Sequence, residues 1–167
     1  MKLPKGFVFR KATIRDIETI IELWQKSRID EGMGKAGESE VCWFISSKIP
    51  LIYTGEVCQW FVEKDEVVVA TGTVQNFVKT GSITDLFVEE EWRGKGLGTA
   101  ILEKLEEQVG ILGIESLNLR ATLETEPYYL RRGWQRHENW PIEKTEAGDA
   151  VTLYKTIFPQ RKSNSPG

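Results

Sequence analysis

The chain has 167 residues, a length that favours one domain able to bury about two-thirds of the surface that its unfolded form exposes. Hydrophobic residues make up 40% and charged residues 28%, as in an ordinary soluble globule. The formal net charge of -3 argues against a general electrostatic attraction to nucleic acid or to an anionic membrane. An anionic ligand would therefore need a local binding device.

The chain has few residues that could form a disulfide bond or a metal site. Cys42 and Cys58 lack the spacing of a disulfide framework or a zinc site, and His137 is the single histidine. Residues 1–7 lack the apolar stretch of a signal peptide, and no apolar run reaches the length of a membrane span. We expect a cytoplasmic protein with reduced thiols, no metal, and no membrane or nucleic-acid partner.

The first part of the chain predicts a strand, two helices and a pair of strands. Residues 7–9 form the strand, and Thr13 then caps a helix with Asp16 in a capping-box position. The buried face of this helix has i, i+3, i+4, i+7 spacing and consists of Ile17, Ile20, Ile21 and Trp24. After a glycine-rich loop over 30–37, the pattern predicts a helix over 38–48 with Pro50 just past its end, then strands over 59–63 and 67–75.

The later part predicts a strand over 82–88, a long helix beginning at Leu97 and a strand over 114–121. A short helix over 127–132 ends at Gly133, and two last strands over 134–139 and 150–158 are joined by a polar loop. We expect one α/β (α+β) domain over residues 1–158, with a mixed, mostly antiparallel sheet of about seven strands and about four helices. Residues 159–167 are expected to form a disordered tail.

The most informative segment is the glycine-rich loop between the predicted strand and the long helix. Gly94, Gly96 and Gly98 have no side chains that would keep an anion away from the unpaired N–H groups of the helix N-terminus. Arg93 and Lys95 add positive charge, so the loop suits a diphosphate. The glycines alone would also permit a tight turn, but their coincidence with basic residues favours anion binding. The G-x-G-x-x-G dinucleotide fingerprint and the Walker P-loop are both absent.

Two motifs carry a resemblance to a known family. Arg93-x-x-Gly96-x-Gly98 resembles the [RQ]-x-x-G-x-[GA] signature of the GNAT superfamily of acyl-CoA-dependent N-acyltransferases. The run from Tyr129 to Trp134 is similar to the Tyr-x-x-x-Gly-aromatic motif of that family. The similarity in element order extends over residues 7–158. Where the family often has Asn and Ala ahead of this tyrosine, the chain has Thr122 and Thr125.

The resemblance implies binding of acetyl-CoA and transfer of its acetyl group to a primary amine by direct attack, through a tetrahedral intermediate. It implies that backbone groups of Phe87 and Val88 pair with the pantetheine arm. The phosphates would be held by Arg93, Gly94, Lys95, Gly96, Leu97, Gly98 and Thr99. Dimers are common in the family, so a homodimer is one expected state.

Tyr129 is the predicted general acid, matching the tyrosine of the family motif; Tyr128 is the neighbouring alternative, which we expect to pack inward. An amine with a pKa of about 10.4 must lose a proton before it attacks. Asp85, on the strand before the loop, is the leading candidate for the base, and a proton-relaying water chain is the alternative. The acceptor is expected between the first two helices. The candidates to bind it there are Glu31, Glu38, Glu40 and Trp43.

Two other functional hypotheses remain open. The chain could be a non-catalytic acyl-CoA sensor that keeps the loop without turnover, or an interaction domain with a coincidental loop. Tyr129 favours catalysis over the sensor, and the pairing of the loop with the Tyr-x-x-x-Gly motif argues against the interaction domain. The sequence leaves the amine open among small molecules, amino acids and peptides.

Overall fold

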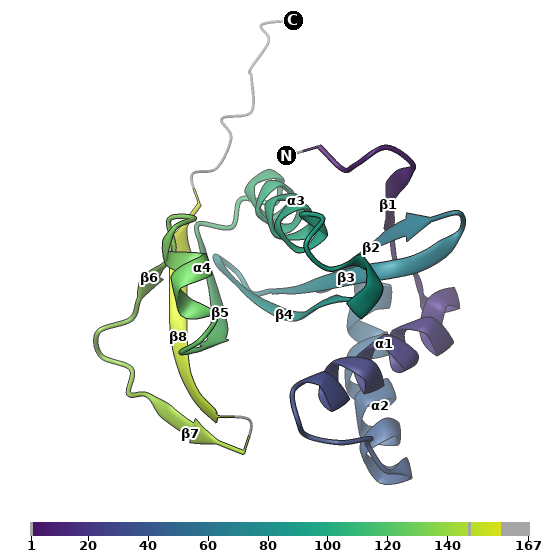
Figure 1. Cartoon of the computed structure of the whole chain (residues 1–167), viewed down its shortest axis with the longest axis horizontal. Coiled ribbons are helices and arrows are strands. Elements are labelled where there is room, and N and C mark those ends of the chain that lie inside the picture. The colour runs from purple at the N-terminus through teal and green to yellow at the C-terminus, as the bar shows by residue number, and fades with distance from the viewer. Residues whose placement is uncertain (1, 147, 158–167) are drawn as a thin grey trace, which may run out of the picture.

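The computed structural model describes residues 2–146 and 148–157, and Figure 1 shows the arrangement of its elements. Within these residues the chain forms eight strands, four α-helices and two short 3-10 helices. In chain order they are β1 (Phe7–Lys11), η1 (Ile14–Asp16), α1 (Ile17–Asp30), α2 (Glu38–Thr54), β2 (Val57–Lys64), β3 (Val67–Asn76), β4 (Thr80–Val88), η2 (Glu90–Trp92), α3 (Leu97–Ile111), β5 (Ser116–Thr122), α4 (Glu126–Leu130), β6 (Gln135–Arg136), β7 (Glu143–Thr145) and β8 (Gly148–Thr156).

The strands form one sheet in the order β1-β2-β3-β4-β5-β8-β6, with β7 pairing to β8. The β4–β5 pair is parallel and the other pairs are antiparallel, which confirms the predicted mixed, mostly antiparallel sheet. The strand beyond the expected seven is β7, which lies in the predicted polar loop and pairs with the first residues of β8. The predicted tail, 159–167, lies outside the described residues, and so does Phe158.

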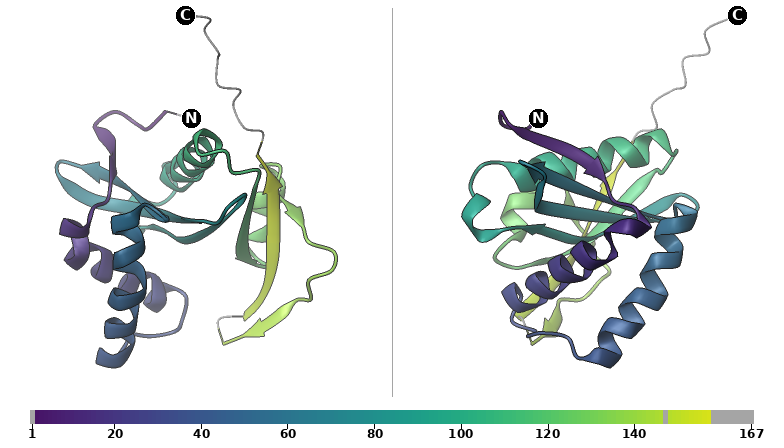
Figure 2. Two further views of the ribbon diagram at one scale, coloured as in Figure 1. Left: turned by 180° about the vertical axis from the view of Figure 1, so that it is seen from behind. Right: turned by 90° about the vertical axis from the view of Figure 1, so that its right-hand side faces the viewer.

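Helices cover both faces of the sheet. Figures 1 and 2 show α3 on one face of β2–β4 and α1 with α2 on the opposite face. The larger buried cluster includes Ile101 and Leu105 of α3, and the smaller one joins Ile20 of α1 to Phe61 and Phe87 of the sheet. The two apolar faces of the central strands are thus both buried, which fixes α1 and α3 on opposite sides of β4.

Helix α2 corrects the prediction that its segment ends before Pro50. The helix runs through Pro50 to Thr54 and ends at Gly55, whose φ of 84° is left-handed. Proline removes one backbone donor from the helix. Here the hydroxyls of Ser46 and Ser47 donate to backbone carbonyls of the preceding turn, and Ile52, beyond the proline, packs against the smaller cluster. Packing of Ile52 against this cluster therefore favours the last turn despite the missing donor.

The N-terminal cap of the first helical segment is confirmed. Thr13 accepts a hydrogen bond from the Arg15 N–H, and the Asp16 carboxylate accepts one from the Thr13 N–H at 2.8 Å. The capped turn is the 3-10 helix η1, which leads directly into α1. Arg10 of β1 also binds the Asp16 carboxylate through two hydrogen bonds, of 3.0 and 2.9 Å. The start of α1 is thereby tied to the edge of the sheet.

A β-bulge interrupts the β3–β4 pairing in the middle of the sheet. Thr71 pairs with Phe87 and Thr73 with Thr84, so Asp85 and Leu86 both lie opposite Gly72. Asp85 has a φ of 53°, in the left-handed region. A Cβ at Gly72 would lie 2.4 Å from Ile101 Cγ2, closer than such atoms approach. The glycine therefore lets α3 sit directly on the bulge.

We expect Gly72→Ala to destabilise the fold by about 1–3 kcal/mol, because the new methyl group overpacks the contact with α3. The urea midpoint of unfolding measures the change. Gly37→Ala is the matched control, since a Cβ there meets nothing within 4 Å and the backbone is not left-handed. Equal midpoints for the two variants would contradict the tight contact between α3 and the bulge.

Candidate functional site

The site begins where β4 and β5 separate. Their parallel pairing runs only from Thr80 opposite Ser116 to Ser82 opposite Asn118. Beyond Ser82 the two strands diverge, and Figure 1 shows the resulting opening between the two parts of the sheet. The last residues of β4, including Phe87 and Val88, still pair with β3 on their other side. The Val88 carbonyl accepts a hydrogen bond from Arg93, and the open side of the strand otherwise suits a ligand that runs alongside it, as an added strand would.

The glycine loop joins the end of β4 to the N-terminus of α3. Gly94 and Gly96 have φ values of 74° and 80°, a left-handed conformation that glycine adopts without steric cost. Gly96 is the N-cap residue, and its carbonyl accepts the Ala100 N–H at 3.0 Å. The first N–H groups of the helix, which include those of Gly98 and Thr99, have no partner within the helix and carry its positive dipole end. This geometry suits an anion, and anion binding at this loop stays a prediction from the sequence.

A groove of about 620 Å³, here called the loop groove, lies over this N-terminus. It contains eight of the nine residues predicted to bind the cofactor, together with Tyr129. Its lining consists of Asp30, Leu86, Phe87, Val88, Trp92, Arg93, Gly94, Gly96, Leu97, Gly98, Thr99, Glu124, Thr125, Tyr128 and Tyr129. Lys95 is the predicted residue that does not line it.

The side chain of Arg93 is directed back along β4. Its Nε donates to the Val88 carbonyl at 3.0 Å, and its Nη2 forms an ion pair with Asp30 at 3.0 Å. The ammonium of Lys95 lies 6.0 Å from the centre of the Trp92 ring. The positive potential in the loop groove therefore comes mainly from the backbone N–H groups.

The two tyrosines of α4 differ in their surroundings. The Tyr128 hydroxyl hydrogen-bonds to Thr99 Oγ1 at 2.5 Å, which links α4 to the first turn of α3. Burial raises the pKa of Tyr129 to about 12, so its phenol stays protonated at neutral pH. The turn ahead of α4 is closed by mutual hydrogen bonds between Thr122 and Thr125, with 3.0 Å between the hydroxyl oxygens.

A second cavity, here called the side cavity, has a volume of about 390 Å³ and adjoins the loop groove. Leu86, Thr125 and Tyr129 line both. The side cavity also contains the predicted base Asp85, but of the four predicted acceptor residues only Glu31 lines it. Its lining is Glu31, Met33, Ile83, Thr84, Asp85, Leu86, Leu119, Arg120, Ala121, Thr122, Thr125, Tyr129, Thr145 and Ala150.

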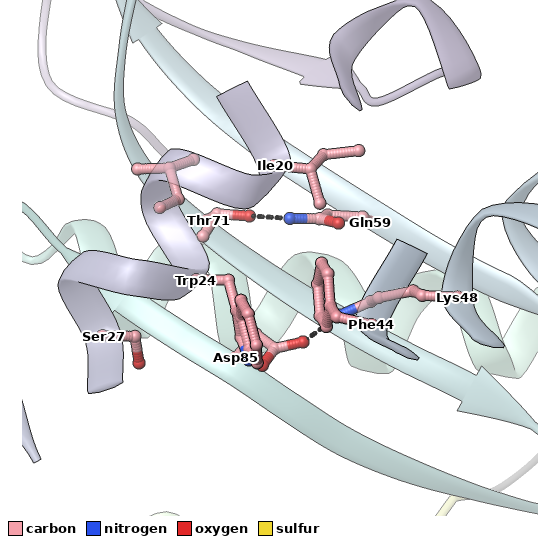
Figure 3. Close-up of a pocket in the computed structure, with 9 residues that line it drawn as sticks. Ile20, Trp24, Ser27, Phe44, Lys48, Gln59, Thr71 and Asp85 are labelled. Atoms are coloured by element: carbon pink, nitrogen blue, oxygen red, sulfur yellow. Dashed lines mark hydrogen bonds and ion pairs between the residues drawn. The ribbon is translucent and has the colours of Figure 1, made fainter. Parts of the chain in front are cut away.

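Asp85 has a cationic partner that the sequence does not indicate. Lys48 of α2 reaches across to β4 and forms a hydrogen-bonded ion pair with the Asp85 carboxylate, as Figure 3 shows. The pair is largely buried, with 12% of the Lys48 side chain and 21% of the Asp85 side chain exposed. Trp24 and Phe44 stack beside it at 4.1 Å between ring centres. A lone lysine on a helix carries no sequence signal for this contact.

Glu31 stands at the C-terminal cap of α1, at the rim of the side cavity. Partial burial, and then the nearby charge of Asp85, raise the pKa of its carboxyl above the usual value. Ser27 Oγ donates to it at 3.5 Å. Glu31 is thus an exposed acidic group in the cavity lining that also contains the two predicted catalytic residues.

Within the described residues, no group of three or more His, Cys, Asp and Glu side chains is placed to hold a metal ion. Across the same part of the chain, every helix is too short or too polar to cross a membrane.

Comparisons with solved structures identify the fold. A predicted acetyltransferase from Clostridium acetobutylicum, solved with acetyl-CoA, has a TM-score of 0.70 and 22% identity, covering 81% of this chain and 94% of that one. The PaiA N-acetyltransferase of Thermoplasma acidophilum, in complex with coenzyme A, has a TM-score of 0.63 and 18% identity, covering 90% and 98%. The ribosomal-protein-S18-alanine N-acetyltransferase of Escherichia coli has a TM-score of 0.64 and 15% identity, covering 94% and 97%.

Among curated protein sequences, none matches the chain. Residues 56–136 match the family model of the acetyltransferase (GNAT) domain. This segment runs from the start of β2 to the end of β6 and includes the bulge, the glycine loop and α4. The chain therefore carries an acetyltransferase (GNAT) domain, and the family predicted from its loop is confirmed.

Proposed function

We propose that this protein is an N-acetyltransferase that moves an acetyl group from acetyl-CoA to a primary amine. The observation that carries the proposal is the junction of two cavities at Leu86, Thr125 and Tyr129. One cavity has backbone donors suited to a diphosphate, and the other has carboxylates suited to a cation. A transferase needs these two sites side by side.

The loop groove fits coenzyme A by its shape and its donors. Gly94 has open space around the position of a Cβ, and Gly98 meets only Val88 Cγ2, at 3.7 Å. A pyrophosphate can therefore approach the N–H groups of the first turn of α3 without a side chain in the way. The unpaired side of β4 suits the amide-bearing pantetheine arm, with Phe87 and Val88 as its backbone partners. Arg93 would have to leave the Val88 carbonyl for that pairing to form.

Bound acetyl-CoA would supply an acetyl group activated as a thioester. A backbone N–H near the end of β4 would stabilise the charge on the thioester oxygen. In the proposed transfer, the neutral amine would add to the thioester carbon, and collapse of the tetrahedral intermediate would then break the C–S bond. The ammonium would lose two protons over the whole reaction. Tyr129, neutral at pH 7, returns one proton to the sulfur, and Asp85 passes the other to solvent. Lys48 already holds the Asp85 carboxylate in an ion pair, so a proton-relaying water chain is the alternative route for this proton.

We also propose that the enzyme acts in the cytoplasm. Cys42 is a free, exposed cysteine and Cys58 a free, buried one, which suits a reducing compartment.

Gly98→Asp tests the anion site, and we expect it to lower the affinity for acetyl-CoA by at least about tenfold through charge repulsion. Gly98 is a better position than Gly96, whose φ of 80° would add backbone strain. An aspartate in the first turn of a helix favours the helix itself, so folding should be retained. Isothermal calorimetry measures the affinity, and Gly98→Ala controls for bulk without charge. Unchanged affinity in the aspartate variant would refute the anion site.

Tyr129→Phe tests the general acid. We expect kcat to fall by about 100-fold, because the hydroxyl that protonates the sulfur is lost, while the affinity for acetyl-CoA stays close to that of the wild type. Release of free thiol measures turnover, and Tyr53→Phe, at an exposed tyrosine outside both cavities, is the matched control. Equal turnover in wild type and Tyr129→Phe would remove Tyr129 from the mechanism. Binding of acetyl-CoA with no transfer to any amine by the wild type would favour the sensor hypothesis instead.

A further inference from the structure

We propose that the acceptor is a primary amine on an apolar group without a free carboxylate, and that Glu31 binds its ammonium. The inference rests on the proposed function and narrows the acceptor, which the sequence leaves open among small amines, amino acids and peptides. It comes from the lining and the charge pairing of the side cavity.

The side cavity is in the position that an acceptor needs. It meets the loop groove at Tyr129 and at Leu86 of β4, next to the Phe87–Val88 backbone. An amine in the side cavity would therefore face the acyl end of a ligand whose phosphates lie at α3. Its volume of about 390 Å³ suits a small molecule.

Apolar side chains provide the larger part of the lining surface of the side cavity. Six side chains contribute apolar surface from the loop after α1 and from the strands β4, β5 and β8; they are Met33, Ile83, Leu86, Leu119, Ala121 and Ala150. Burial of a hydrocarbon group against them is favourable by about 25 cal/mol per Å². The body of the acceptor is therefore expected to be apolar.

Three charged side chains line the cavity, and two of them are already paired. Asp85 is bound by Lys48, and the guanidinium of Arg120 is bound by the carboxylate of Glu143 on β7. Glu31 has a hydroxyl partner, Ser27, rather than a cationic one among the described ion pairs. Glu31 is exposed, so the cavity has one carboxylate outside the described ion pairs, in a place that an ammonium can reach.

The same pairing disfavours a carboxylate on the acceptor. An α-amino acid would bring its carboxylate beside the carboxylate of Glu31, while Arg120, the arginine in the cavity lining, is held by Glu143. Repulsion and the loss of hydration would both weaken binding. Specificity then comes from the rejection of a like charge as well as from the attraction of the ammonium.

A matched series of acceptors tests the substrate class. Phenethylamine and phenylalanine differ by the carboxylate alone, and phenylalaninamide replaces that group by a neutral one of similar size. We expect kcat/KM for phenylalanine to be at least about tenfold below the values for the other two, because only phenylalanine carries the repelled charge. Thiol release at a fixed pH and saturating acetyl-CoA gives these values. A preference for phenylalanine, or equal rates for all three, would overturn the inference.

Glu31→Gln tests the residue. We expect KM for phenethylamine to rise about tenfold with KM for acetyl-CoA unchanged, and the selectivity against phenylalanine to shrink, because one repelling charge is gone. A merely structural role would not change selectivity. Glu18→Gln, at the other end of α1 and outside both cavities, is the matched control and should behave as wild type. Selectivity retained in Glu31→Gln would overturn the assignment of Glu31.

Calorimetry with acetyl-CoA on the same wild-type sample separates the two levels of failure. If acetyl-CoA binds and amino acids are the better acceptors, the inference fails while the proposed function stands. If acetyl-CoA binds and none of the three acceptors reacts, the substrate class is wrong. If acetyl-CoA does not bind, the proposed function and the inference that rests on it are both wrong.

Discussion

The divergence of β4 from β5 after Ser82 is the constraint on which both cavities depend. A parallel pair that continued to Val88 would close the sheet and bury the backbone groups that a ligand needs. The bulge at Asp85 and Leu86 accompanies the divergence, because two residues opposite the single Gly72 bend β4 and increase its twist. The opening is thus a property of the strand register rather than of a flexible loop.

The packing of α3 connects this opening to the core. Ile101 and Leu105 lie against Gly72, so the helix is seated on the strand opposite the bulge. Its N-terminus, which carries the unpaired donors, is consequently held at the end of β4 by buried contacts about one turn away. Donors fixed in this way need not reorganise when an anion arrives, which is the condition under which they bind it most strongly.

The parts of the fold and site that could be predicted are those with local causes. The loop 93–99 is visible in the sequence because glycine spacing, basic residues and a strand-to-helix change occur within a few positions. The passage of α2 through Pro50 has no local signal, because the packing of Ile52 against the smaller cluster is a long-range contact. The ion pair between Lys48 and Asp85 joins residues 37 positions apart, and neither has a pattern that marks the other. Long-range contacts of this kind decide which predicted acceptor residue lines the side cavity.

The proposed function requires one cavity to bind an anion and the other to bind a cation, on a chain with a negative net charge. A net charge of -3 repels an anion at long range, so the loop groove relies on dipoles at close range, with Arg93 held by Asp30. The side cavity needs negative charge, yet two unpaired carboxylates there would repel each other. Lys48 pairs with Asp85, and among the described residues of the lining Glu31 is the carboxylate that we propose attracts a cation. Tyr129 lines both cavities and its phenol stays protonated at neutral pH. It therefore adds no charge that would repel a ligand from either cavity.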